Sequence, residues 1–170
     1  MPATSPSPAT QPAIGAHVDS ADPVSAARER GAGLSQFFLG NPQSYKGPVV
    51  EFEGGPEALK ADAEAAGVDL YVHAPYLINV ATTNNRIRIQ SRKLLQQFVD
   101  AAASVGAKGL IVHGGHVDKE DDVDKGFDNW RKAIEATDLR VPLLLENTAG
   151  GDNAMARTLE RIASVWDAIG

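Results

Sequence analysis

The chain has 170 residues, enough for one domain with a sizeable core, and 43% of them are hydrophobic, as is typical of a soluble globular protein. It contains no cysteine, so disulfides and thiolate zinc sites are excluded, and any metal must bind His, Asp or Glu. The formal net charge of −6 argues against broad electrostatic binding of nucleic acid, although a local basic patch would override this.

The N-terminal segment, residues 1–12, is rich in Pro, Ala, Ser and Thr. We expect it to be a disordered tail, because these residues bury too little apolar surface to order a chain. It has neither the basic start nor the apolar core of a secretory signal, and no apolar run in the sequence approaches the length of a membrane span. We therefore expect a cytoplasmic protein with no membrane partner.

From residue 13 onward, one pattern repeats five times: a short apolar run, a loop and an amphipathic segment. The apolar runs predict strands at residues 14–18, 36–39, 70–73, 109–113 and 143–146. The amphipathic segments predict five helices. The first starts at residue 22 or 23 and ends by 31–33. The others are expected at 56–66, at 84–105, around 127–136, and from about 154 almost to the end. In the last of these, Met155, Leu159, Ile162, Ala163 and Trp166 fall on one side.

Strands that alternate with helices predict a parallel sheet, and the apolar strand sequences suit burial on both faces. The five units average about 31 residues, so eight would give roughly 250, the size of a closed (β/α)8 TIM barrel. We therefore predict an α/β fold in which residues 13–170 form the first five βα units of a TIM barrel. A flavodoxin-like sheet of five strands is an alternative that the periodicity does not exclude.

Four potential metal ligands fall where expected strands end: His17, His73, His113 and Glu146. The carboxyl ends of parallel strands converge on one face, where the active sites of such folds lie. Two His and one Glu form a known ligand set of catalytic zinc, which also keeps a position open for water. A single His in such a place is more often a hydrogen-bonded loop anchor, so the joint pattern carries the prediction.

Other polar groups have simpler explanations. His17 could orient a ligand instead of being one, and His116 is more typical of a surface or supporting group. The acidic run at 118–124 suits a solvated helix start, since acidic side chains favour helix N-termini. A solvated helix face also explains the basic cluster Arg86, Arg88, Arg92 and Lys93.

The stretches IGAHV, YVHAPYLINVA, LIVHGGH and LLENTAGG occur in this order over nearly all of residues 13–170. In this the chain resembles the endonuclease IV family of apurinic/apyrimidinic endonucleases, also called deoxyribonuclease IV. The resemblance implies a closed (β/α)8 barrel with three zinc ions. It also implies hydrolysis of double-stranded DNA on the 5′ side of an abasic site, in base excision repair.

By this resemblance, His73 and His113 bind one zinc, and Glu146 bridges it to a second and is the catalytic candidate. Tyr76 and Leu77 match residues that enter the DNA at the lesion. Gln43 stands where the family often places a probing side chain, frequently Arg, and Gln lacks the charge.

The family's remaining ligands lie on its last three strands, beyond this sequence, so at most one zinc site keeps its protein ligands here. The resemblance thus implies that the chain alone is a poor catalyst unless a second chain supplies the missing strands. Two alternatives stay open: a metal-dependent sugar isomerase-like TIM barrel, which HAPYLIN and ENTAG disfavour, and a non-catalytic fragment.

Overall fold

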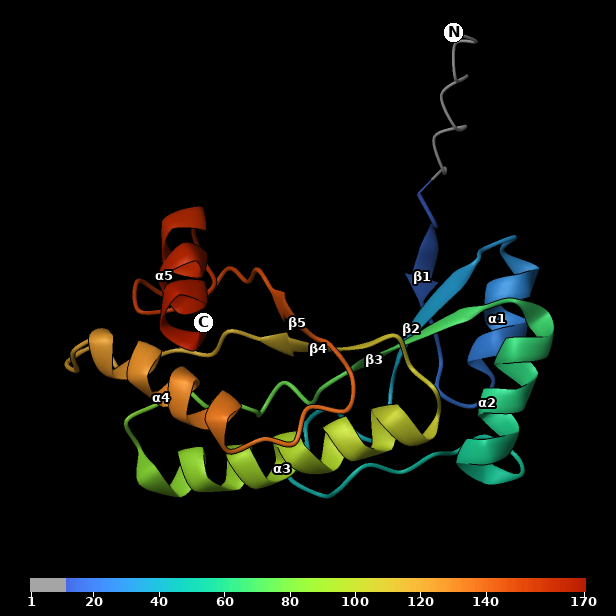
Figure 1. The fold of residues 1–170 in the computed structure, drawn as a ribbon, viewed down its shortest axis with the longest axis horizontal. Helices are drawn as coiled ribbons and strands as arrows, with labels where there is room; N and C mark the ends of the chain where they lie inside the picture. The colour runs from blue at the N-terminus through green and yellow to red at the C-terminus, as the bar shows by residue number, and fades with distance from the viewer. Residues whose placement is uncertain (1–11) are drawn as a thin grey trace, which may run out of the picture.

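The structure, a computed structural model, describes residues 12–170 (Figure 1). The predicted disordered tail therefore lies outside the described residues, apart from its last position. Five strands alternate with five helices: β1 (Gly15–His17), α1 (Pro23–Glu29), β2 (Leu34–Phe38), α2 (Gly55–Ala66), β3 (Asp69–His73), α3 (Asn85–Ser104), β4 (Gly109–His113), α4 (Asp124–Glu135), β5 (Leu143–Glu146) and α5 (Leu159–Ile169).

All four strand pairs are parallel, and the spatial order of the strands is that of the sequence, β1-β2-β3-β4-β5. This order decides between the two predicted architectures. A flavodoxin-like sheet has the order 2-1-3-4-5, whereas in a βα barrel each strand pairs with the next along the chain. The predicted partial TIM barrel is therefore confirmed, and Figure 1 shows the helices surrounding one side of the sheet.

The two faces of the sheet differ in burial. Side chains that point toward the helices, including Phe37, Val72 and Leu110, are buried completely and form the core. The alternate positions of the same strands, such as Phe38 and Ile111, are only half-buried. Successive side chains of a strand point to opposite faces, so these residues line the side that becomes the interior of a closed barrel. The expectation that the strands are buried on both faces is therefore wrong for this chain.

Local sequence explains most helix boundaries. α1 starts after Asp22, whose carboxylate accepts a hydrogen bond from the Ser25 amide, and Pro23 occupies the first turn. α2 ends at Gly67, whose φ of 64° is readily adopted only by glycine. α3 starts after Asn84, whose side chain accepts from the amides of the first turn.

Two helix starts differ from their prediction. α4 begins at Asp124, three residues before the expected 127. α5 begins at Leu159, with Thr158 as its N-cap, and not near 154. Met155, placed on this helix from its spacing, is instead buried in the loop before it, while Leu159 and Trp166 are 82% and 50% exposed. Among the described residues, no helix is both long enough and apolar enough to cross a membrane.

Candidate metal centre

The ends of three neighbouring strands bring three side chains together. His73, His113 and Glu146 are the last residues of β3, β4 and β5. In the sheet register His113 lies opposite Glu146, and His73 lies opposite Ile111, two residues before His113. Because side-chain direction repeats every two residues, all three side chains lie on the barrel-interior face.

The three groups converge on one carboxylate oxygen. His73 Nε2 lies 2.8 Å from Glu146 Oε2, and His113 Nε2 lies 3.3 Å from the same atom. One ligand atom from each residue lies within 4.8 Å of the others, so the three could hold one metal ion. His73 is buried, while 41% of the Glu146 side chain is exposed, so the centre opens to solvent on the Glu146 side.

Hydrogen bonding fixes which nitrogen of His73 faces the centre as an acceptor. His73 Nδ1 lies 2.7 Å from the Ala74 carbonyl oxygen, which only accepts, so Nδ1 carries the proton. In the neutral ring, Nε2 then presents a lone pair to the lone pairs of Glu146 Oε2 at 2.8 Å. That contact is favourable only if a proton or a metal cation lies between the two atoms. The donor set therefore fits a cation such as zinc, for which a backbone-held Nδ1–H is the usual support.

Burial favours the neutral, metal-binding form of His113. Loss of hydration is the main cause that lowers its pKa below the ordinary value, and it outweighs the opposing attraction of Glu146. His17 has a lowered pKa as well, first because of burial and then because of repulsion by His73. Metal binding requires unprotonated imidazole, so these environments reduce proton competition near neutral pH.

Aromatic rings surround the histidines. The Phe38 ring lies 5.0 Å from the His73 ring, and the Tyr76 ring lies 5.3 Å from His113 and 5.6 Å from His73, between centroids. Phe38 and Tyr76 are themselves in edge contact at 5.2 Å. These contacts restrict rotation of the two imidazoles and make one wall of the centre apolar.

Neither of the remaining histidines joins the group. His17 ends β1 as expected, but its Nδ1 pairs with Gln36 Nε2 at 2.8 Å, and its ring centroid lies 6.3 Å from that of His73. His116 is exposed, and its ring and backbone face Asn79. Of the four strand-end groups in the sequence prediction, three therefore converge, and His17 lies beside them.

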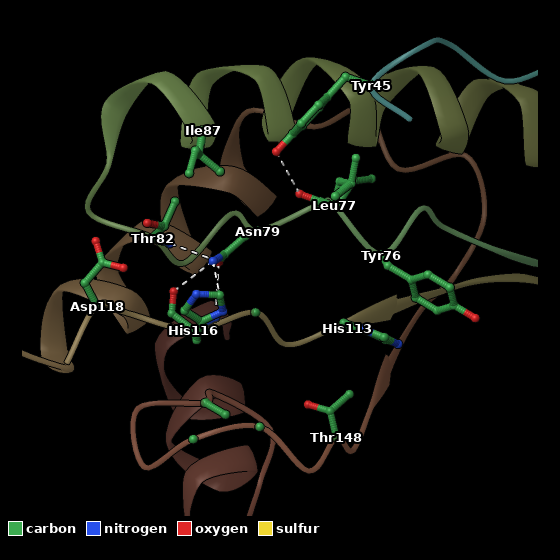
Figure 2. Close-up of a pocket in the computed structure, with 15 residues that line it drawn as sticks. Tyr45, Tyr76, Leu77, Asn79, Thr82, Ile87, His113, His116, Asp118 and Thr148 are labelled. Carbon is green, nitrogen blue, oxygen red and sulfur yellow. Dashed lines mark hydrogen bonds between the residues drawn. The ribbon is translucent and has the colours of Figure 1, made fainter. Parts of the chain in front are cut away.

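The residues expected to meet DNA lie on two loops that contact each other. Gln43 is exposed in the β2–α2 loop, and Tyr76 and Leu77 lie in the β3–α3 loop, with Tyr76 48% exposed. The Tyr76 amide donates to the Pro42 carbonyl at 3.0 Å, next to Gln43. Tyr76, Leu77 and His113 also line a cleft of about 500 Å³, which Thr148 borders from the β5–α5 loop (Figure 2). The cleft adjoins the candidate metal centre at His113.

Residues of the basic cluster and of the acidic run, both expected to be solvated, make hydrogen bonds and ion pairs within the protein. Arg88 donates to the Thr82 and Thr83 carbonyls, and Arg92 donates to the Asn129 carbonyl. Two of the four side chains of the basic cluster therefore bind backbone carbonyls. In the acidic run, Asp121 accepts from Thr83 and lies 3.8 Å from Lys125.

A family model described as "Xylose isomerase-like TIM barrel" matches residues 24–170. The chain belongs to the xylose isomerase-like TIM barrel family. Within this family, it is 54% identical over 157 residues to a protein named "Probable endonuclease 4" from Mycobacterium tuberculosis, an alignment that covers 92% of this chain and 60% of that protein. The chain thus spans about three fifths of the length of the curated relatives it matches.

Two solved structures agree with the fold. Endonuclease IV from Thermus thermophilus superposes with a TM-score of 0.75 at 28% identity, over 91% of this chain and 58% of that one. L-ribulose 3-epimerase superposes with a TM-score of 0.67 over 92% of this chain and 58% of that one, but its identity is 14%, so it shows the fold alone. The resemblance to endonuclease IV seen in the sequence motifs is confirmed.

Sequence reasoning missed two residues, one beside the candidate metal centre and one that lines the cleft. Phe38 is half-buried beside His73, and its strand position, two residues after Gln36, is the only signal that it faces the same side. Asn79 is 8% exposed and lies in the apolar stretch YLINVA. A single polar residue in an apolar run indicates a buried hydrogen-bonding role, because burial without a partner is costly.

Proposed function

We propose that this chain carries the first metal site of a zinc-dependent apurinic/apyrimidinic endonuclease of the endonuclease IV type. The proposed reaction is hydrolysis of the phosphodiester 5′ of an abasic site in double-stranded DNA, in base excision repair. The observation that carries the proposal is the convergence of His73, His113 and Glu146 in a chain 54% identical to a probable endonuclease 4. We propose a cytoplasmic location, with which the cysteine-free sequence is compatible.

The metal would be held by Nε2 of His73, Nε2 of His113 and a carboxylate oxygen of Glu146, the three atoms that converge. Nitrogen and carboxylate ligands suit zinc, which as a Lewis acid would polarise a phosphoryl oxygen. The carboxylate of Glu146 is 41% exposed, so a second ion would have access to it. Three ions are expected from the endonuclease IV resemblance, and this chain provides the protein ligands of at most one.

The protein's own contribution beside the metal is to bind and orient DNA. Tyr76 and Leu77 project beside the centre and would enter the duplex at the lesion, where a missing base leaves a gap for them. Gln43, on the adjoining loop, would probe the same gap through hydrogen bonds without the charge of an Arg. The hydrogen bond from the Tyr76 amide to the Pro42 carbonyl supports these roles, because it holds the two loops together.

We further propose that full activity needs strands and metal ligands in addition to those of residues 12–170, and that a second polypeptide is one source of them. Hydrolysis of a phosphodiester is assisted most when metals stabilise both the attacking and the leaving oxygen, and a single metal site should do this poorly. A sugar isomerase-like activity is the second candidate function, but the epimerase likeness supports only the shared fold.

The first test combines zinc content with DNA incision. Elemental analysis of the purified chain should find zinc, and Glu146→Ala should lower zinc affinity by more than the roughly 10–100-fold that loss of an outer partner costs. Incision of a labelled duplex with one abasic site, with zinc added, should be lost in Glu146→Gln, which keeps the shape but not the charge.

Two results would contradict the proposal. Zinc content equal in the wild type and in Glu146→Ala would remove the metal site. Measurable incision that is equal in the wild type and in Glu146→Gln would mean that the cleavage comes from a contaminant or another site. Turnover of keto sugars in place of incision would favour the isomerase alternative.

A further inference from the structure

We propose that Asn79 is a positioning residue that locks the β3–α3 loop, which carries Tyr76 and Leu77, to the β4–α4 loop that follows His113. The inference deepens the proposed function and rests on it for the roles of these two loops. Asn79 touches none of the three candidate metal ligands, and it acts through the backbone of the loops on either side of the cleft (Figure 2).

The Asn79 carboxamide binds both backbone groups of one residue in the opposite loop. Its Oδ1 accepts from the His116 amide at 3.2 Å, and its Nδ2 donates to the His116 carbonyl at 3.0 Å. The same Oδ1 accepts from the Thr82 amide at 3.1 Å, which closes its own loop. The side chain thus imitates a strand partner and joins two segments that are 37 residues apart in sequence.

Only a carboxamide of this length satisfies the pairing. A carboxylate at the same position would keep the acceptor but would face the His116 carbonyl with no proton to donate. Asn79 is 8% exposed, so the unmatched groups would stay away from water, where leaving them unpaired costs the most.

The surrounding residues are arranged to keep this amide in place. The Asn79 backbone amide donates to Ser91 Oγ at 2.9 Å, and Ser91 is fully buried on α3. Gly115 has a φ of 70°, and a Cβ built there would lie 2.4 Å from Asn79 Oδ1, so the close approach requires glycine. The lock also continues to the next loop, since the Met155 amide donates to the Gly115 carbonyl at 2.9 Å.

The lock sets the separation of the groups that border the cleft. Tyr76 lies three residues before Asn79, and His113 lies three residues before His116. A short segment of equal length therefore connects each of these rings to the Asn79–His116 pairing. Their rings face each other at 5.3 Å. A hinge motion of either loop would change this distance and, with it, the placement of His113 relative to His73 and Glu146.

The chain offers a matched control in Asn129. It is similarly buried, at 7% exposed, and its Nδ2 donates to two backbone carbonyls, those of Ala81 and Thr82. These bonds tie α4 to the β3–α3 loop but do not reach the β4–α4 loop. Asn129→Asp therefore makes the same chemical change at similar burial without opening the lock.

The test measures amide hydrogen exchange by mass spectrometry and zinc affinity by calorimetry in full-length variants. In Asn79→Asp we expect exchange across residues 114–117 to accelerate by about tenfold or more, because the donor to the His116 carbonyl is replaced by a carboxylate oxygen that repels it and opens the pairing. Zinc affinity should fall by about tenfold, as for other groups that orient metal ligands indirectly. Asn79→Ala, which buries no charge, should behave likewise if the carboxylate variant unfolds.

In Asn129→Asp, faster exchange should be confined to the segment around residues 81–83, with zinc affinity within about twofold of the wild type. Unchanged exchange across 114–117 in both Asn79 variants would overturn the proposal, as would an equal loss of zinc affinity in Asn129→Asp. If the wild-type chain binds no zinc, the proposed function fails in its metal site, while the exchange comparison still decides whether Asn79 locks the loops.

Discussion

At the scale of single residues, His113 and His17 couple the centre to pH. Burial is the largest cause that lowers the pKa of each below 6.5 in the folded chain. Between that lowered pKa and 6.5, the unfolded chain binds more protons than the folded one, so stability rises with pH through this window. The stability that the neutral forms of these two histidines contribute is fully present above pH 6.5. It is lost as the pH falls through the pKa that each has in the folded chain.

We therefore expect the metal-free chain, kept in a chelator, to melt at a lower temperature near pH 5 than near pH 8. His113→Ala should reduce the difference between the two melting temperatures, because it removes one of the groups that must be charged while buried. A pH dependence that His113→Ala leaves intact would refute this account.

Residue types explain which parts of the site could be predicted. His73, His113 and Glu146 are chemically distinctive, and each follows an apolar run, so strand-end geometry brings them together from sequence alone. The roles of Asn79 and Phe38 depend on contacts between segments far apart in the chain, as in the pairing of Asn79 with His116. No local pattern encodes such a partner.

At the scale of elements, the strands were predicted better than the last helix. The expected strands at 109–113 and 143–146 coincide with β4 and β5. The helix expected from about 154 starts later because Ala154, Met155 and Ala156 are buried residues of the loop before α5. The Met155 amide donates to the Gly115 carbonyl in the β4–α4 loop at 2.9 Å, and the Thr148 amide donates to the Ala156 carbonyl within their own loop at 3.1 Å. Apolar spacing reports burial, and it cannot separate a buried loop from a helix face.

The observed start of α5 gives a stability prediction. Thr158 Oγ1 accepts from the Arg161 amide at 3.2 Å, so Thr158→Ala should lower the free energy of unfolding by about 1 kcal/mol. Ser164→Ala in the same helix is the control: its hydroxyl donates to the Glu160 carbonyl, a bond that adds little to a helix, so its effect should stay within about 0.5 kcal/mol. Urea unfolding measures both, and equal effects would argue against Thr158 as the N-cap.

At the scale of the whole molecule, the described part of the sheet has β1 and β5 at its two edges, each paired on one side only. Beside the β5 edge, Leu144 is 38% exposed, and α5 exposes Leu159 and Trp166, which lie seven residues apart and therefore on one face of the helix. An unpaired strand beside an apolar helix face is the surface that a further βα unit would cover.

This surface yields the last prediction, which tests the proposed second polypeptide. A polypeptide made from the part of the Mycobacterium tuberculosis relative outside the matched 157 residues should bind this chain, and the mixture should incise an abasic-site duplex faster than either component. Changing Leu159 and Trp166 to Lys should weaken binding by about 30-fold or more, since a central Trp commonly contributes about 2 kcal/mol to an interface. Sedimentation velocity measures the association.

Ile89→Lys supplies the control, because Ile89 is 67% exposed on α3, away from the β5 edge. Binding that survives the double substitution on α5 would place the second polypeptide elsewhere. Binding without any gain in incision would separate assembly from catalysis. The added strands would then pair with the sheet, but their ligands would not complete a metal centre with His73, His113 and Glu146. A gain in incision that Glu146→Gln abolishes would show that both polypeptides contribute to one centre.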